Sequence, residues 1–406
     1  MAPFKVKKQI HNSRVSPYNT SLEKIPLLIL LPNEEETHEH SSVSFLNPEA
    51  KKVDQKNPPN QLRNSRCVGS SHGWIVLLDE CSDPYLFDPF SCRQISLPPK
   101  ETFPHLVSVS GSSEYGFDVE YVHGVQQSHV HRSITAKELQ EGLVLKAILS
   151  SDPSHGNDED YLVMVIYGCD AKVAMCKQGD SLWMDLDGKH WPYCDIICHK
   201  KRLFALSETG YVESWSLKGP LLVKTMNFHP LYTCSKMATE PACVYFDRER
   251  FTSRCYLVES RGDLLLVERH IGEFVGPNDE AVREADLLSD DCSHPLVYPY
   301  KTLEFTVYMV DFVQQKMEEV ESLGDHTLFV GKNHSMSLCA AQYPSHFRRN
   351  SIYFTDDYWE RMNEDYLYGG HDVGVFSLGD KSVRPLKHLD LRQRIDPAPF
   401  WLVPSM

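Results

Sequence analysis

Residues 350–378, NSIYFTDDYWERMNEDYLYGGHDVGVFSL, hold the densest group of side chains that could do chemistry. Two neighbouring carboxylates can hydrolyse a glycoside if burial shifts the pKa of one while the other stays ionised. Five acids within ten residues are more typical of a solvated segment, or of one paired with Arg361. We therefore predict no catalytic residues, with a hydrolase that uses Asp356 and Asp357 as the alternative. The five acids are Asp356, Asp357, Glu360, Glu364 and Asp365.

The aromatic residues of the same segment favour binding over catalysis. Tyrosine and tryptophan are large, rigid and amphipathic, and they dominate the energetics of protein interfaces. A second interpretation, in which Trp359 attaches the segment to the rest of the fold, stays open. Gly369 and Gly370 allow a sharp turn into the apolar run VGVFSL. The predicted partner-binding loop comprises Asp356, Asp357, Tyr358, Trp359, Arg361, Tyr366 and Tyr368.

Three short motifs resemble functional sites but are better explained as turns. GSSHG at residues 69–73 matches the pattern around a nucleophilic serine, Ser71. Such a serine must lie between a strand and a helix, whereas the following WIVLL predicts a strand. Gly331 and Lys332 lack the spacing and the hydroxyl residue of a phosphate-binding Walker loop. RGD at residues 261–263 predicts a two-residue hairpin turn. For GSSHG, an esterase that uses Ser71 as its nucleophile remains an alternative.

Cys194, Cys198 and His199 are the densest group of soft metal ligands. On a strand the two thiols would lie about 13 Å apart, which is too far to bind one zinc ion. The twelve cysteines are scattered singly through apolar stretches, as reduced, buried thiols usually are. We predict no metal site and no cofactor, and a cytoplasmic or nuclear location.

The chain of 406 residues carries a formal net charge of −15. Nucleic-acid binding relies on clustered lysine and arginine side chains, so this charge argues against a nucleic-acid partner and favours a basic protein surface. The longest apolar run, IPLLILLP at residues 25–32, is too short to cross a bilayer. We predict neither nucleic-acid nor membrane binding.

From Cys67 onwards, short apolar runs alternate with turn residues, which is the pattern of an all-β fold. Groups of three or four such strands recur about every 40 to 50 residues, which predicts the blades of a single β-propeller. We expect six or seven blades, preceded by a short irregular N-terminal segment. The best helix candidates are residues 136–142 and 279–291, both in loops.

Five long segments of the chain carry a family resemblance. They are CVGSSHGWIVLLDE, DGKHWPYCDIICHKKRLFALSETGYVESWSL, CYLVESRGDLLLVERH, VESLGDHTLFVGKNHSMSL and NSIYFTDDYWERMNEDYLYGGHDVGVFSL. Together they resemble the plant KIB-type β-propeller family, an F-box-associated domain, over residues 67–386. We expect an N-terminal lead-in at residues 1–60, the propeller at 61–390, and a C-terminal segment at 391–406 that closes the ring.

In that family the propeller usually follows an F-box, a helical module that docks on the Skp1 adaptor of a ubiquitin ligase, and the propeller selects the substrate. The resemblance therefore implies a protein-recognition module without catalysis, and protein partners. Residues 1–60 contain no recognisable F-box, which argues against binding of a Skp1-type adaptor. A further alternative is an F-box-less decoy that shields partners from ubiquitination.

Overall fold

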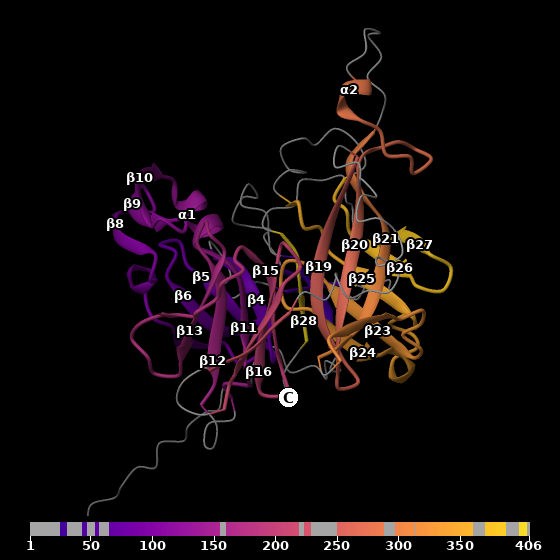
Figure 1. Ribbon diagram of the computed structural model, residues 1–406, viewed down its shortest axis with the longest axis horizontal. Helices are drawn as coiled ribbons and strands as arrows, with labels where there is room; N and C mark the ends of the chain where they lie inside the picture. Colours follow the sequence, from indigo (N-terminus) through magenta and orange to yellow (C-terminus); the bar gives the residue numbers. More distant parts are fainter. Residues whose placement is uncertain are drawn as a thin grey trace, which may run out of the picture.

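The chain folds into small β-sheets joined by turns. In Figure 1, sheets that follow one another in the sequence lie next to one another in space. The C-terminal strand β28 lies in the middle of the molecule, beside β4. A computed structural model describes residues 25–30, 43–46, 53–56, 65–154, 160–218, 223–228, 250–287, 297–312, 314–359, 370–386 and 398–403.

The N-terminal lead-in contributes three strands to a four-stranded antiparallel sheet. β1 (Leu27–Leu30) pairs with β2 (Val43–Leu46) and with β28 (Phe400–Leu402), and β2 pairs with β3 (Val53–Lys56). Leu28 lies opposite Trp401, and both are fully buried. The expectation of an irregular N-terminal segment is therefore wrong. Strands of four residues show almost no alternation in sequence, and β1 takes one partner from the far end of the chain.

Five further antiparallel sheets follow in chain order. The first consists of β4 (Arg66–Ser71), β5 (Trp74–Leu78), β6 (Pro84–Asp88) and β7 (Arg93–Ser96). The second consists of β8 (Leu106–Ser112), β9 (Gly116–His123) and β10 (Ser128–Ile134). The third consists of β11 (Val144–Leu149), β12 (Leu162–Tyr167), β13 (Lys172–Lys177) and β14 (Met184–Asp185). The fourth consists of β15 (Tyr193–His199), β16 (Arg202–Ser207), β17 (Val212–Ser216) and β18 (Val223–Phe228).

The last two sheets contain the longest strands and the one parallel pair among the described residues. One consists of β19 (Phe251–Ser260), β20 (Asp263–Val275), β21 (Tyr298–Asp311) and β22 (Lys316–Glu319). The other has five strands in the order β24-β23-β25-β26-β27, and β23 runs parallel to β25. Its strands are β23 (His326–Val330), β24 (Met336–Cys339), β25 (Ser351–Phe354), β26 (Gly374–Ser377) and β27 (Ser382–Pro385).

Buried apolar side chains join neighbouring sheets. Clusters connect β4–β7 to β11–β14, β11–β14 to β15–β18, β15–β18 to β19–β22, and β19–β22 to the five-stranded sheet. Another cluster joins the five-stranded sheet to the β28–β1–β2–β3 sheet and to β4–β7, and it includes Phe329, Trp401 and Ile75. β5 reads WIVLL and is buried at all five positions, because both of its faces are covered.

Polar contacts also link the first strands of three neighbouring sheets. Lys146 on β11 forms an ion pair of 2.5 Å with Asp195 on β15, and both side chains are buried. The other carboxylate oxygen of Asp195 accepts a hydrogen bond of 2.6 Å from the backbone N–H of Leu257 on β19. Burial raises the pKa of Asp195, and Lys146 partly offsets this. The ion pair therefore compensates each charged group for the hydration that it loses on burial.

The helices among the described residues are short. α1 (Ala136–Leu143) begins at a capping box in which Thr135 and Glu138 exchange hydrogen bonds. It packs with the β8–β10 sheet over the cluster shared by β4–β7 and β11–β14. α2 (Glu284–Leu287) spans only four residues of the 279–291 candidate. Neither helix is long and apolar enough to cross a membrane.

Two motifs that resemble functional sites form hairpin turns. Arg261 and Gly262 have φ of +58° and +84° and connect β19 to β20, as predicted for RGD. In GSSHG, Ser71 is the last residue of β4, and the turn itself consists of His72 and Gly73 before β5. Because a strand follows, Ser71 has no helical N–H groups beside it.

Candidate functional site

The predicted partner-binding loop begins directly after β25, which is buried at every position. The structure describes Asp356, Asp357, Tyr358 and Trp359, and it describes the chain again from Gly370. The three other predicted residues lie outside the described residues: Arg361, Tyr366 and Tyr368.

Asp356 is 2% exposed and accepts several hydrogen bonds. The hydroxyl of Tyr300 donates to it at 2.7 Å, the backbone N–H of Tyr358 at 2.8 Å and the backbone N–H of Asp372 at 3.1 Å. His371 Nδ1 lies 3.3 Å from the same carboxylate. Burial alone would raise the pKa of Asp356, but the hydrogen bonds from His371 and Tyr300 outweigh it and hold the pKa below its usual value.

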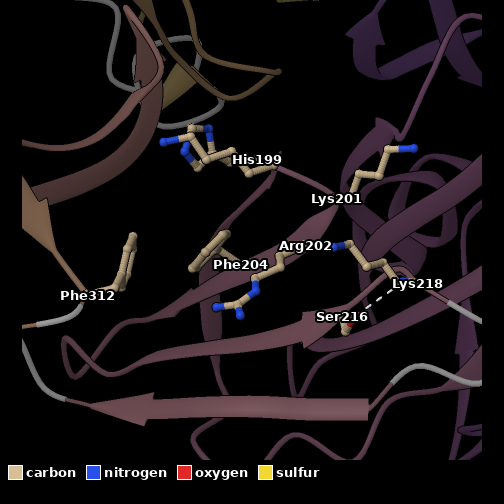
Figure 2. Close-up of a pocket in the computed structure, with 8 residues that line it drawn as sticks. His199, Lys201, Arg202, Phe204, Ser216, Lys218 and Phe312 are labelled. Atoms are coloured by element: carbon tan, nitrogen blue, oxygen red, sulfur yellow. Dashed lines mark hydrogen bonds between the residues drawn. The ribbon is translucent and has the colours of Figure 1, made fainter.

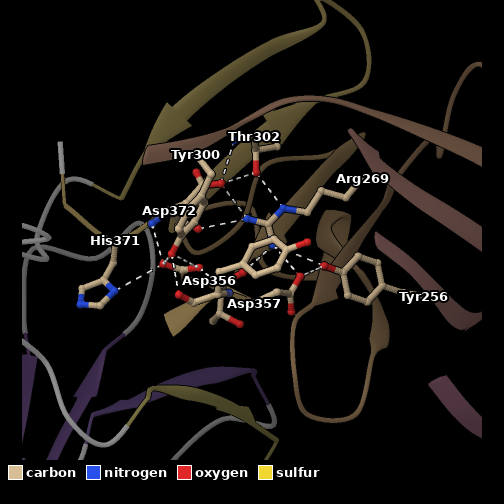
Figure 3. A network of polar contacts seen from close by, with 10 residues as sticks. Tyr256, Arg269, Tyr300, Thr302, Asp356, Asp357, His371 and Asp372 are labelled. Carbon is tan, nitrogen blue, oxygen red and sulfur yellow. Dashed lines mark hydrogen bonds and ion pairs between the residues drawn. The ribbon is translucent and has the colours of Figure 1, made fainter. Parts of the chain in front are cut away.

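Asp357 and Asp372 share the guanidinium of Arg269, which lies on β20 and is 1% exposed (Figure 3). Arg269 Nη1 lies 2.9 Å from Asp357 Oδ2, and Nη2 lies 3.0 Å from Asp372 Oδ2. Arg269 Nε donates to Thr302 at 2.7 Å, and Tyr256 donates its hydroxyl to Asp357. Burial raises the pKa of Asp372, and Arg269 partly offsets this. We call these groups, with Asp356, Tyr300 and His371, the Arg269 network.

The aromatic residues beside the network are packed into the fold. Trp359 is 1% exposed and stacks on His371, with ring centroids 3.5 Å apart and planes 6° apart. Tyr358 contacts Tyr300 edge to face, and the Arg254 guanidinium lies 4.9 Å from the Tyr358 ring centroid. The residues on either side of positions 360–369 are therefore held together by stacked rings.

These contacts correct the expectation for the acids. Asp356 and Asp357 are not solvated, because buried partners from β19, β20 and β21 bind them. Pairing with Arg361 stays a prediction, because Arg361 lies outside the described residues. Sequence reasoning missed Arg269, although a signal exists. Arg269 has the same parity on β20 as the buried Leu265, Val267 and Ile271, and a cation on a buried face requires a buried acid.

The thiols considered as metal ligands have separate partners. Cys194 Sγ donates to the carbonyl oxygen of Leu206, and Cys198 Sγ lies 3.6 Å from Met164 Sδ. Burial raises the pKa of both thiols to about 12, so both stay protonated at neutral pH. Both therefore pack as small apolar side chains.

Another group of residues, not singled out from the sequence, could hold a metal ion. His123, Cys169 and Asp170 place one ligand atom each within 4.8 Å of one another. The carboxylate of Asp170 already accepts a hydrogen bond from the Gly124 N–H at 2.9 Å and lies 3.7 Å from Lys172 Nζ. A metal ion would compete with both groups for this carboxylate.

Comparison with known families identifies the architecture. The family model described as KIB1-4 beta-propeller matches residues 45–377. The chain belongs to the KIB1-4 beta-propeller family. The match begins inside β2 and extends to the end of β26, so it includes the Arg269 network.

Curated relatives of this KIB1-4 propeller come from Arabidopsis thaliana. F-box protein SKIP23 is 22% identical over 347 residues, which is 83% of this chain and 75% of the relative. F-box protein At2g26160 is 26% identical over 299 residues, which is 71% of this chain and 74% of the relative.

Solved structures resemble the KIB1-4 propeller more weakly. The N-terminal domain of Nup159 has a TM-score of 0.27 and 11% identity, and the comparison covers 75% of this chain and 70% of that chain. The computationally designed Ika8 protein has a TM-score of 0.27 and 9% identity, with 72% of this chain and 87% of that chain covered.

Proposed function

We propose that this KIB1-4 propeller is a protein-recognition module that acts like the substrate-binding part of a ubiquitin-ligase receptor, without catalysis of its own. The proposal rests on one observation: the relatives that match most of the chain are named F-box proteins. Its partner is a protein, and its proposed location is the cytoplasm or the nucleus. It needs no cofactor, nucleic acid or membrane.

We also propose that six of the seven sheets are blades of a closed propeller. The apolar clusters that connect these six sheets form one cycle, which supports closure. The pairing of β28 with β1 supports a shared last blade built from both ends of the chain. In this arrangement the β8–β10 sheet is an insertion between the blade β4–β7 and the blade β11–β14.

The chemistry of the described residues favours recognition over hydrolysis. A glycosidase needs two carboxylates that a substrate can reach, one of them protonated at neutral pH. Asp356 is buried with a lowered pKa, and Asp357 is tied to Arg269 and Tyr256. Ser71 is 5% exposed at the end of a strand. A hydrolase would need these side chains accessible to a substrate, whereas here they are buried within the fold.

Affinity purification from plant cells followed by mass spectrometry tests the recognition function. We expect a defined protein partner that is retained by the chain and lost by the double variant Tyr366→Ala/Tyr368→Ala. The control is Tyr115→Ala, because Tyr115 is 86% exposed in the turn between β8 and β9. If the double variant retains the partner equally well, this loop does not contribute to the interface.

Two further measurements separate a receptor from a decoy. A pull-down with a Skp1-type adaptor shows whether the chain joins a ligase, and the half-life of the captured partner shows the consequence. A receptor shortens that half-life when it is overexpressed, whereas a decoy lengthens it. Hydrolysis of glycosides or esters by the purified chain, abolished by Asp357→Asn or Ser71→Ala, would contradict the proposal.

A further inference from the structure

A cavity of about 370 Å³ lies at the turn between β15 and β16. Figure 2 shows its walls, which come from this turn, from the end of β17 and from the residue that follows β21. Its volume lies in the range of small-ligand sites. The cavity is lined by His199, Lys200, Lys201, Arg202, Phe204, Ser216, Lys218 and Phe312.

The polar wall of this cavity is cationic in a chain of net charge −15. Within the described part of the chain, Lys200, Arg202 and Lys218 form no ion pair, and Lys201 lines the cavity beside them. These cations repel one another, and the two acids that act on the adjacent His199, which are Glu259 and Asp263, form no ion pair with them among the residues that the structure describes. A bound anion would relieve this repulsion. The cavity therefore has the charge of an anion site.

His199 points to the same conclusion. It is 7% exposed, and its Nδ1 has no hydrogen-bond partner among the described residues. A buried polar atom without a partner costs free energy, and a ligand that hydrogen-bonds to His199 Nδ1 would recover it. Burial, with a smaller contribution from Lys200, lowers the pKa of His199, and it outweighs the opposing effect of Glu259 and Asp263. The ring is therefore neutral, and one ring nitrogen can donate.

The turn that carries the lysines is conformationally strained. Lys200 and Lys201 have φ of +49° and +58°, a region in which a side chain meets the backbone. The comparable turns before β5 and β20 place Gly73 and Gly262 at the second position. Asparagine and glycine are the favoured pair in such turns. Two lysines there indicate that the turn serves binding at the expense of stability.

The opposite wall is apolar. The rings of Phe204 and Phe312 stack with centroids 4.7 Å apart, and Phe204 is 2% exposed. Together they place an aromatic surface next to the cationic turn (Figure 2). The cavity therefore offers a ligand cations on one wall and an aromatic surface on the other.

We propose that this cavity binds a phosphoryl group, with Lys200, Arg202 and Lys218 neutralising its charge and His199 Nδ1 donating to one of its oxygens. A phosphoryl group suits several cations better than a carboxylate does, because it carries up to two charges on three acceptor oxygens. Two sources share this chemistry: a phosphorylated side chain of a peptide and a soluble inositol phosphate. The site does not depend on the proposed ubiquitin-ligase function.

Isothermal titration calorimetry on the full chain distinguishes the two sources. The probes are a phosphoserine peptide with a neighbouring phenylalanine, the same peptide with serine, and inositol hexakisphosphate. We expect saturable 1:1 binding of the phosphopeptide or of the inositol phosphate, displaced by inorganic phosphate. The unphosphorylated peptide binds at least tenfold more weakly if the phosphoryl group is what the cavity recognises.

The decisive variant is Lys200→Asn/Lys201→Gly, which installs the favoured turn pair while it removes two cations. We expect a higher Tm together with at least tenfold weaker binding of the phosphorylated probe. Lys177→Gln/Lys381→Gln removes the same charge from exposed sites that pair with Asp160 and Glu304, and it should bind within twofold of the unaltered chain.

Three results would overturn the proposal. One is the absence of saturable binding by both phosphorylated probes. Another is an equal loss of affinity in the turn variant and in the control. The third is equally tight binding of an unrelated single-stranded oligonucleotide, which would indicate general attraction of polyanions.

Discussion

Replacing Arg269 with methionine tests whether the Arg269 network stabilises the fold. Methionine keeps much of the side-chain length but removes the guanidinium that bridges Asp357 and Asp372. Asp357 keeps the hydroxyl of Tyr256, and Asp372 keeps the N–H and hydroxyl of Thr302. Two buried carboxylates, 8% and 9% exposed, lose their bridging cation.

The size of the effect follows from the burial of these groups. Removing one partner of a buried ion pair costs about 3 to 5 kcal/mol, because the remaining charge keeps its desolvation penalty. Arg269→Lys retains the charge but cannot bond both carboxylates in one plane, so we expect a smaller loss, about 2 kcal/mol. The neutral triple variant Arg269→Met/Asp357→Asn/Asp372→Asn should recover most of the lost stability, because it leaves no unpaired charge.

The pH dependence gives the sharper measurement. Burial already raises the pKa of Asp372, and removal of Arg269 takes away the attraction that partly offsets it. An acid whose folded pKa lies above its unfolded value binds protons more readily in the native state, so stability rises as the pH falls. Urea denaturation should therefore show the deficit of Arg269→Met largest at neutral pH and smaller near pH 5. A deficit below about 1 kcal/mol, typical of an exposed pair, or one independent of pH would refute the reasoning.

Two further substitutions probe the packing between sheets. Gly69→Ala would place a Cβ 2.0 Å from the carbonyl oxygen of Ala147 on the neighbouring β11, so we expect the free energy of unfolding, measured by urea denaturation, to fall by several kcal/mol. The control Gly142→Ala in α1 meets open space and should raise the free energy of unfolding by about 0.5 to 1 kcal/mol. Lys146→Met leaves Asp195 buried without its cation and should lower the free energy of unfolding by about 3 to 5 kcal/mol. The double variant Lys146→Met/Asp195→Asn should recover part of this loss. Equal stability of the two variants would show that the unpaired charge of Asp195 does not cause the loss.

The all-β architecture could be predicted because most strands carry their own signal. Continuous apolar runs such as WIVLL and paired turn residues such as Arg261 and Gly262 are local features, and the structure places each in the expected strand or turn. The first sheet could not be predicted, since β1 and β28 lie more than 350 residues apart and neither exceeds four residues. The β8–β10 sheet has three antiparallel strands, the size of group expected for a blade, so strand spacing could not fix the number of blades.

The candidate site was harder to predict because its partners come from distant strands. The sequence shows Asp356 and Asp357 among many acids, and only the fold brings Tyr300 and Arg269 to them. Trp359 illustrates the same limit. A tryptophan side chain suits an interface and a core equally. Its stacking on His371 places it in the core, as expected if Trp359 attaches the segment to the rest of the fold.

The charged side chains of the Arg269 network and of the β15–β16 cavity differ in how completely they are paired, and this difference separates structure from binding. Each group also contains one buried histidine nitrogen without a hydrogen-bond partner among the described residues, His371 Nε2 and His199 Nδ1. In the Arg269 network, Arg269 donates to acceptors inside the chain, and Asp356 accepts from four donors. A ligand there would have to break bonds as good as those it offers. Around the strained β15–β16 turn, Lys200, Arg202 and Lys218 form no ion pair within the described part of the chain. Since affinity comes from bonds that the free protein cannot make with itself, the turn is the better place for a ligand.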